Sequence, residues 1–83
     1  MGEEKITAKD AAKAAAAYFR DITDYQGPLN LEEVELTPDE KYWLITLAYE
    51  EPKDFSFMGA KKYKLLEVDT STGEVVSMKI RAV

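Results

Sequence analysis

The strongest strand pattern in this chain is the stretch Tyr42-Trp43-Leu44-Ile45-Thr46-Leu47-Ala48-Tyr49-Glu50. Successive side chains of a strand point to opposite faces of its sheet. One face therefore carries Trp43, Ile45, Leu47 and Tyr49, and the other carries Tyr42, Leu44, Thr46 and Ala48. The alternation predicts a strand over residues 42–50, and we expect its Trp43 face to meet a helix.

A helix is predicted before this strand, from about Ala8 to Thr23. Thr7 can cap its first turn, and Gly27 suits a left-handed cap after its last turn. Apolar residues recur at steps of three and four and form one stripe, made of Ala8, Ala11, Ala12, Ala15, Phe19 and Ile22. The small alanine side chains allow the helix to lie close to the sheet.

Further strands are expected over residues 31–37, 61–69 and 75–82, the first as an edge strand with a wet face. The segment from Asp69 to Glu74 contains Gly73 and reads as the turn of a hairpin. The predicted fold class is α+β, with one N-terminal helix packed on a four-stranded antiparallel meander sheet, a cystatin-like order of elements. Residues 1–83 form a single domain, because a chain of this size cannot bury two cores.

The register of the last hairpin decides which residues are buried. If Asp69 pairs with Glu74, Leu65 faces Met78 on the core side. A slip of one residue would place Lys64 opposite Ile80 in the core, so the first register is preferred. The residues then expected to be buried together are Trp43, Ile45, Leu47, Phe19, Ile22, Met78 and Ile80.

Composition argues against catalysis. Histidine and cysteine are both absent, which removes the usual general base near neutral pH, the thiolate nucleophile and the common ligands of zinc. The 16 acidic residues show no spacing that singles out a catalytic pair or a calcium loop. We therefore predict that the protein is not an enzyme and holds no cofactor or metal.

Charge and hydropathy bear on partners and location. The net charge of −5 repels phosphate backbones, so nucleic acid is not expected as a partner. No apolar run approaches the roughly 18 residues of a membrane span. As written, the chain is expected to be cytoplasmic, because its N-terminus is acidic. A secreted origin is the alternative if Met1-Gly2 begins a piece of a longer protein.

The last hairpin carries a family resemblance. A helix beginning near the pair Ala11-Ala12, followed by strands joined through Val68-Asp69-Thr70-Ser71-Thr72-Gly73-Glu74-Val75, resembles PepSY-type domains. That resemblance implies a regulatory or propeptide-like role beside peptidases. The order of elements also resembles cystatins, but their inhibitory Gln-x-Val-x-Gly and Pro-Trp motifs do not occur here, so inhibition of thiol proteases is not supported.

Two surfaces could bind a partner. The loop residues Phe55, Phe57 and Met58 could act as apolar anchors, or they could fold back and close the core. On the outer face of the sheet, an apolar set would lie beside Lys62, Lys64, Lys79 and Arg81; its members are Tyr42, Leu44, Leu66, Val68 and Val75. Burial at the edge of the core is the alternative for this set.

The leading hypothesis is a non-catalytic protein-interaction module with a regulatory or inhibitory role. Weak self-association, or a protein partner, is expected at the outer face or at an exposed edge of strand 31–37 or 75–82. The basic residues of the outer face would resist stacking on a second copy unless they met acids such as Glu33 or Glu35. The alternatives are a small-ligand domain with a cavity between helix and sheet, and an idealised scaffold.

Overall fold

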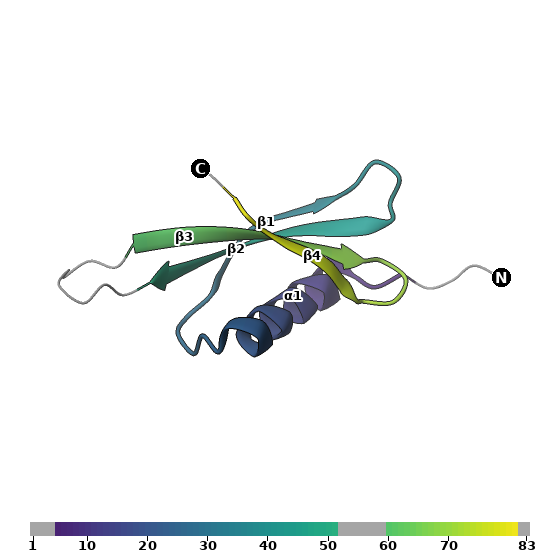
Figure 1. The fold of residues 1–83 in the computed structure, drawn as a ribbon. Coiled ribbons are helices and arrows are strands. Elements are labelled where there is room, and N and C mark those ends of the chain that lie inside the picture. The colour runs from purple at the N-terminus through teal and green to yellow at the C-terminus, as the bar shows by residue number, and fades with distance from the viewer. Residues whose placement is uncertain (1–4, 52–59, 82–83) are drawn as a thin grey trace.

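A computed structural model describes residues 5–51 and 60–81. Helix α1 (Ala8–Thr23) is followed by β1 (Asn30–Leu36), β2 (Tyr42–Glu51), β3 (Ala60–Asp69) and β4 (Val75–Ile80). The strands pair antiparallel in the order β1-β2-β3-β4, and α1 lies along one face of the sheet (Figure 1). The predicted fold class is confirmed. The predicted strand bounds differ from these by one or two residues at several ends, where hydrogen bonding is least regular.

Helix α1 begins and ends at the predicted residues, Ala8 and Thr23, but the residue that caps its end is not the predicted one. The Oγ1 of Thr7 accepts a hydrogen bond from the Asp10 N–H at 3.1 Å, so the predicted N-cap is confirmed. The left-handed residue after the helix is Asp24, with φ 59°, and its N–H donates to the Arg20 carbonyl. The prediction of Gly27 as this cap is wrong. Gly27 is needed instead for close approach, because a Cβ there would collide with the Tyr25 hydroxyl.

The left-handed conformation of Asp24 gives a stability prediction. Asp24→Gly should raise the free energy of unfolding by about 1 kcal/mol, because glycine adopts positive φ without the steric cost of a Cβ. The variant also removes an acid from the negative end of the helix dipole. Urea unfolding followed by circular dichroism measures the change. Asp24→Asn removes only the charge, and it should recover no more than about half of the gain.

The hydrophobic core lies between α1 and the two central strands. Its fully covered residues are Ala11, Ala15, Phe19, Ile45, Leu47, Leu66 and Val68. The ring of Phe19 lies 4.9 Å from the ring of Tyr49 and 5.7 Å from that of Tyr25, centroid to centroid, and these rings close one end of the core. The expectation that the Trp43 face of β2 meets the helix is confirmed, with Trp43 itself half-buried against the core.

Two residues expected in the core lie outside it. The exposed fraction of Ile22 is 55%, and that of Ile80 is 81%. Ile22 follows the turn of α1 that carries Phe19, at the end of the core that the aromatic rings already close. Ile80 lies at the end of the edge strand β4, and a single helix cannot cover all four strands. Met78, also expected in the core, packs against it partly buried.

A β-bulge corrects the predicted register of the last hairpin. The Asp69 N–H does donate to the Glu74 carbonyl, so the pairing beside the turn is as expected. Val76 is then an extra residue, because Val68 pairs with Val75 and Glu67 pairs with Ser77. Beyond it Met78 pairs with Leu66 and Ile80 with Lys64, which is the slipped register that we did not prefer. Every side chain of β3 consequently lies on the face opposite to the expected one.

A second bulge shapes the other edge of the sheet. In β1, Leu31 pairs with Leu47 and Glu33 with Thr46, so Glu32 is the extra residue. The bulge brings Leu31 onto the same face as Val34, although three positions separate them. The same spacing relates Val75 and Met78 in β4, and both pack against the core. Each edge strand thus uses one bulge to turn apolar residues toward the helix side.

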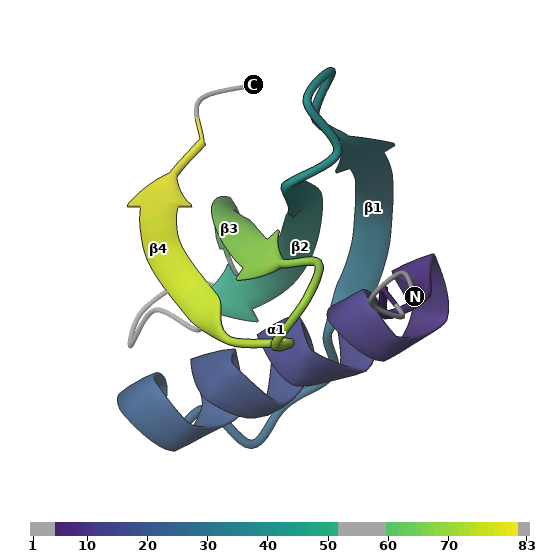
Figure 2. The ribbon, with the colours of Figure 1, turned by 90° about the vertical axis from the view of Figure 1, so that its right-hand side faces the viewer.

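The sheet curves away from the helix. In Figure 2, β1 and β4 rise as two walls on either side of β2 and β3, and α1 crosses beneath them. Residues of all four strands line one hollow on the face opposite α1, among them Glu33, Leu44, Leu65 and Lys79. Bulges increase local strand twist and bending, which fits their position in the two edge strands. The face away from the helix is therefore concave.

Thr70 joins three segments at one end of the sheet. Its buried Oγ1 donates toward the carbonyls of Glu40 and Lys41, and its carbonyl accepts from the Ile6 N–H at 2.8 Å. The Trp43 Nε1–H donates to the Ile6 carbonyl at 3.1 Å. The segment before α1 is thus fastened to the ends of β2 and β3.

Candidate functional site

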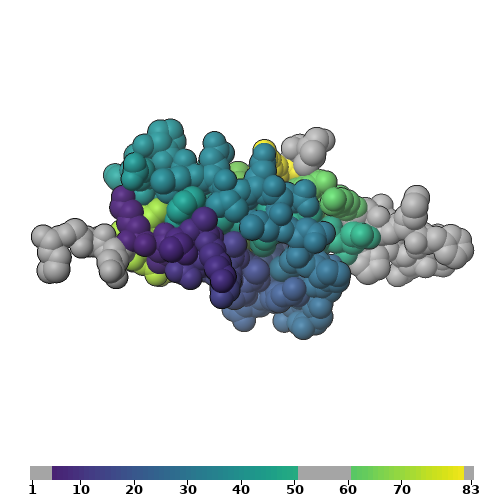
Figure 3. All heavy atoms as spheres, turned by 180° about the vertical axis from the view of Figure 1, so that it is seen from behind, coloured from purple at the N-terminus to yellow at the C-terminus, as the bar shows by residue number. Residues whose placement is uncertain are grey.

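An apolar groove separates α1 from the edge strand β1. Its volume is about 390 Å³, and Lys9 and Lys13 are its charged lining residues. The apolar lining consists of Ala8, Ala12 and Ala16 from the helix, together with Leu29, Leu31, Val34 and Leu47. Figure 3 shows the side of the molecule on which the helix and β1 are seen together. Leu31 is 50% exposed, and Val34 and Leu36 are 37% exposed. The groove is therefore open to solvent beside Leu31 and Val34, and the apolar surface of β1 continues past it to Leu36.

The backbone of β1 is available on the side away from β2. The Thr37 N–H donates to the Tyr42 carbonyl, which makes this a hydrogen-bonded pair. Hydrogen-bonded and non-hydrogen-bonded pairs alternate along antiparallel strands, so Val34 and Leu36 direct their N–H and C=O groups outward. Among the residues that the structure describes, no strand pairs with this edge. All seven residues of β1 are exposed.

The opposite face of β1 is acidic and contributes to the concave side of the sheet. Glu33 pairs with Arg81 across this face, and the same guanidinium donates to the buried Thr46 Oγ1 at 2.6 Å. Glu35 and Lys79 line the same hollow, whose volume is about 370 Å³. One wall of the concave face therefore carries acids and the other carries bases.

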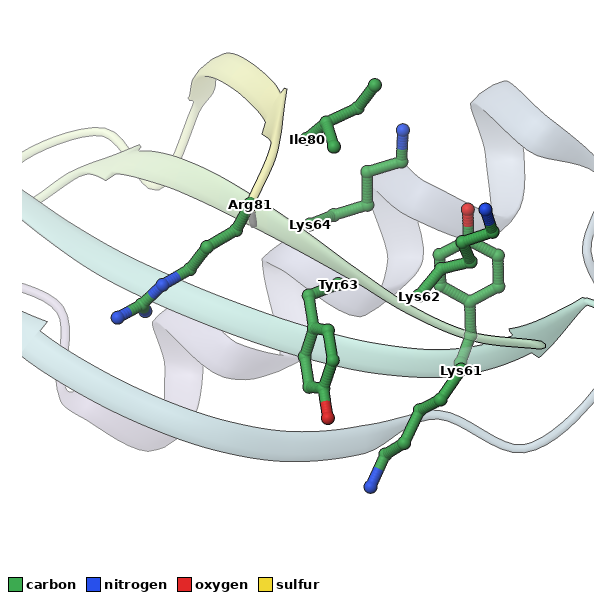
Figure 4. Close-up of a pocket in the computed structure, with 7 residues that line it drawn as sticks. Lys61, Lys62, Tyr63, Lys64, Ile80 and Arg81 are labelled. Carbon is green, nitrogen blue, oxygen red and sulfur yellow. The ribbon is translucent and has the colours of Figure 1, made fainter. Parts of the chain in front are cut away.

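A basic hollow of about 410 Å³ lies where β3 extends past the end of β4. Lys61, Lys62, Lys64 and Arg81 line it. Figure 4 shows Lys61 and Tyr63 leaving one side of β3, while Lys62 and Lys64 leave the other. The Lys61 ammonium lies 5.7 Å from the centre of the Tyr63 ring, within cation–π range. These cations belong to both faces of the sheet and do not converge on a single point.

The turn between β1 and β2 holds an acid with a shifted pKa. The Thr37 hydroxyl donates to the Asp39 carboxylate at 2.6 Å, and the Lys41 N–H donates to it at 3.0 Å. These hydrogen bonds stabilise the charged form, so the pKa of Asp39 lies below its ordinary value. The side chain is fully exposed. The hydrogen bonds order the turn at the end of the open edge.

The predicted interaction residues lie in different parts of the structure. Tyr42 and Leu44 lie half-buried on the concave face, away from the helix, as predicted. Leu66 and Val68 were expected beside them, but both are fully buried in the core, because the bulge at Val76 reverses the faces of β3 relative to the expected register. Val75 also packs against the core. Phe55, Phe57 and Met58 lie outside the described residues.

The groove and the Arg81 contacts were missed in the sequence. An edge strand with Val34 and Leu36 on one side was predicted, but its relation to the alanines of α1 depends on how the helix is rotated over the sheet. Ala11 and Ala15 face the core, which leaves the neighbouring stripe of Ala8, Ala12 and Ala16 at the groove. The spacing of Glu33 and Arg81, 48 residues apart, gives no sequence signal of their contact.

Two kinds of feature do not occur within the described ranges 5–51 and 60–81. No three acidic side chains there lie close enough together to hold a metal ion. No helix in that part of the chain is long and apolar enough to cross a membrane.

No protein-family model, curated protein or solved structure matches this chain. What the fold defines is a class: a small α+β domain with one N-terminal helix on a four-stranded antiparallel sheet. No family is assigned within that class.

Proposed function

We propose that the domain is a non-catalytic protein-interaction module that binds an extended segment of a partner protein along the open edge of β1. The observation that carries the proposal is the position of this edge beside the apolar groove. An added strand would satisfy the outward backbone groups of Val34 and Leu36, and its alternate side chains would enter the groove. Backbone pairing would supply affinity and the groove would supply selectivity.

The two faces of β1 define the chemistry of the bound segment. On the helix side, Leu31, Val34 and Leu36 are exposed and apolar, so apolar side chains fit there. On the concave side, Glu35 would attract basic side chains, together with Glu33, which pairs with Arg81 in the free domain. The preferred segment therefore alternates apolar and basic residues.

Two further observations concern the regulatory role of the module and the alternative hypothesis of a small-ligand site. The resemblance of the last hairpin to PepSY-type domains supports a regulatory or inhibitory role, with an extended peptide segment as the bound element. The rival hypothesis is a small-ligand site between helix and sheet. Ala11, Ala15 and Phe19 fill the contact between α1 and the central strands, and the apolar space beside β1 is an open groove, so the packing favours binding at the surface.

Binding of short synthetic peptides tests the proposal. A peptide of alternating valine and lysine should bind and shift the amide resonances of β1, whereas a peptide of alternating valine and glutamate should bind about tenfold more weakly. Reversal of two cross-strand charge pairs accounts for a difference of this size. Equal binding of both peptides, or shifts confined to other strands, would contradict the proposal.

Variants of the edge provide the control. Val34→Pro removes an N–H that points away from β2, so the domain should remain folded while peptide binding is lost. Leu31→Lys places a charge at the exposed end of the groove and should weaken binding without touching the backbone of the edge. Circular dichroism checks the fold of each variant. Peptide binding that survives both changes in folded protein would rule out this edge.

A further inference from the structure

The two edges of the sheet have matching patterns. β1 carries Leu31, Val34 and Leu36 on the helix side and Glu33 and Glu35 on the concave side. β4 carries Met78 and Ile80 on the helix side, since they pair with Leu66 and Lys64, and Lys79 on the concave side, followed there by Arg81. Apolar residues thus occupy the same face at both edges, and the charges on the other face are opposite.

At both edges, the residues with apolar side chains on the helix side also direct their backbone N–H and C=O groups outward. The Arg81 N–H donates to the Tyr63 carbonyl, so Arg81 and Lys79 direct their backbone groups toward β3. Met78 and Ile80 consequently direct theirs outward, as Val34 and Leu36 do in β1. The outward groups at both edges therefore belong to the residues whose side chains lie on the helix side, so a strand pair formed between two copies keeps the helices on one face.

The even number of strands determines whether β1 of one copy runs antiparallel to β4 of another. Four antiparallel strands leave β1 and β4 running in opposite directions. When a second copy extends the sheet in the same orientation, its β1 is antiparallel to the β4 that it meets. The continued sheet therefore keeps the strand direction and the layer order of a single copy.

We propose that the segment bound at β1 is β4 of a second copy of this chain. In the register that matches all of these features, Val34 lies opposite Ile80 of the other copy and Leu36 lies opposite Met78. Glu35 then meets Lys79, and Glu33, which pairs with Arg81 of its own chain, lies opposite Arg81 of the other copy. Ile80, which is 81% exposed in one chain, gains an apolar neighbour across the seam. The inference rests on the proposed function and names its partner.

Sedimentation of the full chain over micromolar to millimolar concentrations tests the inference. We expect reversible association, either as a closed pair or as a longer row, because the same two edges meet in both. Glu35→Lys and Lys79→Glu each place like charges at the seam and should each weaken association about tenfold. Among the residues that the structure describes, neither Glu35 nor Lys79 forms an ion pair, so both variants should stay folded.

Mixing the two variants gives the decisive result. Glu35→Lys carries lysine at both positions 35 and 79, and Lys79→Glu carries glutamate at both, so an equal mixture should associate through 35–79 pairs of opposite charge although each variant alone is weakened. A wild-type chain that stays monomeric at millimolar concentration overturns the inference, as does association that Lys79→Glu leaves unchanged. If the alternating peptide still binds β1 in that case, the proposed function stands and only the identity of the partner is wrong.

Discussion

Leu66→Lys is expected to unfold the domain, whereas the same change at its neighbour, Leu65→Lys, should leave it folded. Leu66 is fully buried beneath α1, and Leu65 is half-buried on the concave face. An unpaired ammonium in the core costs several kcal/mol. In other proteins, removing one partner of a buried ion pair leaves such an uncompensated charge and costs about 3–5 kcal/mol. A loss of that size removes most of the stability of a domain this small, which lies near the lower end of about 5–15 kcal/mol.

Thermal melting followed by circular dichroism distinguishes the two variants. The adjacent positions receive the same chemical change, so a difference between them reports only which face of β3 is buried. Unfolding by Leu65→Lys with tolerance of Leu66→Lys would show that the faces of β3 are inverted and that Val76 does not form a bulge.

Phe19→Ala should lower the free energy of unfolding by about 3–5 kcal/mol, the usual cost of truncating a buried phenylalanine. The Phe19 side chain is only 1% exposed, and its ring contacts those of Tyr25 and Tyr49, so its removal leaves a space that the surrounding rings cannot easily fill. Urea unfolding measures the loss.

Ile22→Ala is the matched control for this truncation. Ile22 lies on the same helix but is 55% exposed, so its truncation should cost less than about 1 kcal/mol. Equal losses at both positions would mean that the last turn of α1 is covered in solution, contrary to the structure.

The helix and strands of this fold could be predicted because capping residues and hydrophobic periodicity are properties of short stretches of sequence. Thr7, as a capping residue, predicts the start of α1, and the alternation around Trp43 predicts the central strand β2. The faces of β3 could not be predicted, because a period of two fails wherever a bulge intervenes. Val75 and Met78 lie three positions apart and yet both pack against the core. A preference for keeping Lys64 away from the core led to the wrong register.

Lys64 also shows why that preference failed. It pairs with Leu47 on one side and with Ile80 on the other, on the helix side of the sheet, but its side chain is only half-buried. A long lysine side chain can cover apolar surface with its methylene groups while its ammonium reaches water. Its sequence position alone therefore does not distinguish the wet face of β3 from the buried one.

The candidate site was less accessible to sequence analysis than the fold. The edge position of β1 was expected, but the groove beside it combines Val34 with Ala12 of the helix, and no local pattern reports that contact. The ion pair of Glu33 with Arg81 likewise joins opposite edges of the sheet. Long-range geometry of this kind depends on strand curvature, which the two bulges influence.

The backbone hydrogen bond between Ile6 and Thr70 has a consequence for the order of folding. α1 can form from local contacts, but the hydrogen bonds that fix its beginning join residues 64 positions apart, from Ile6 to Thr70. Closing so long a loop costs entropy before any contact is gained. We therefore expect the segment before α1 to take up its final position only after β3 has paired with β2. In that order of events the meander hairpins assemble first, and the docking of this segment completes the native state.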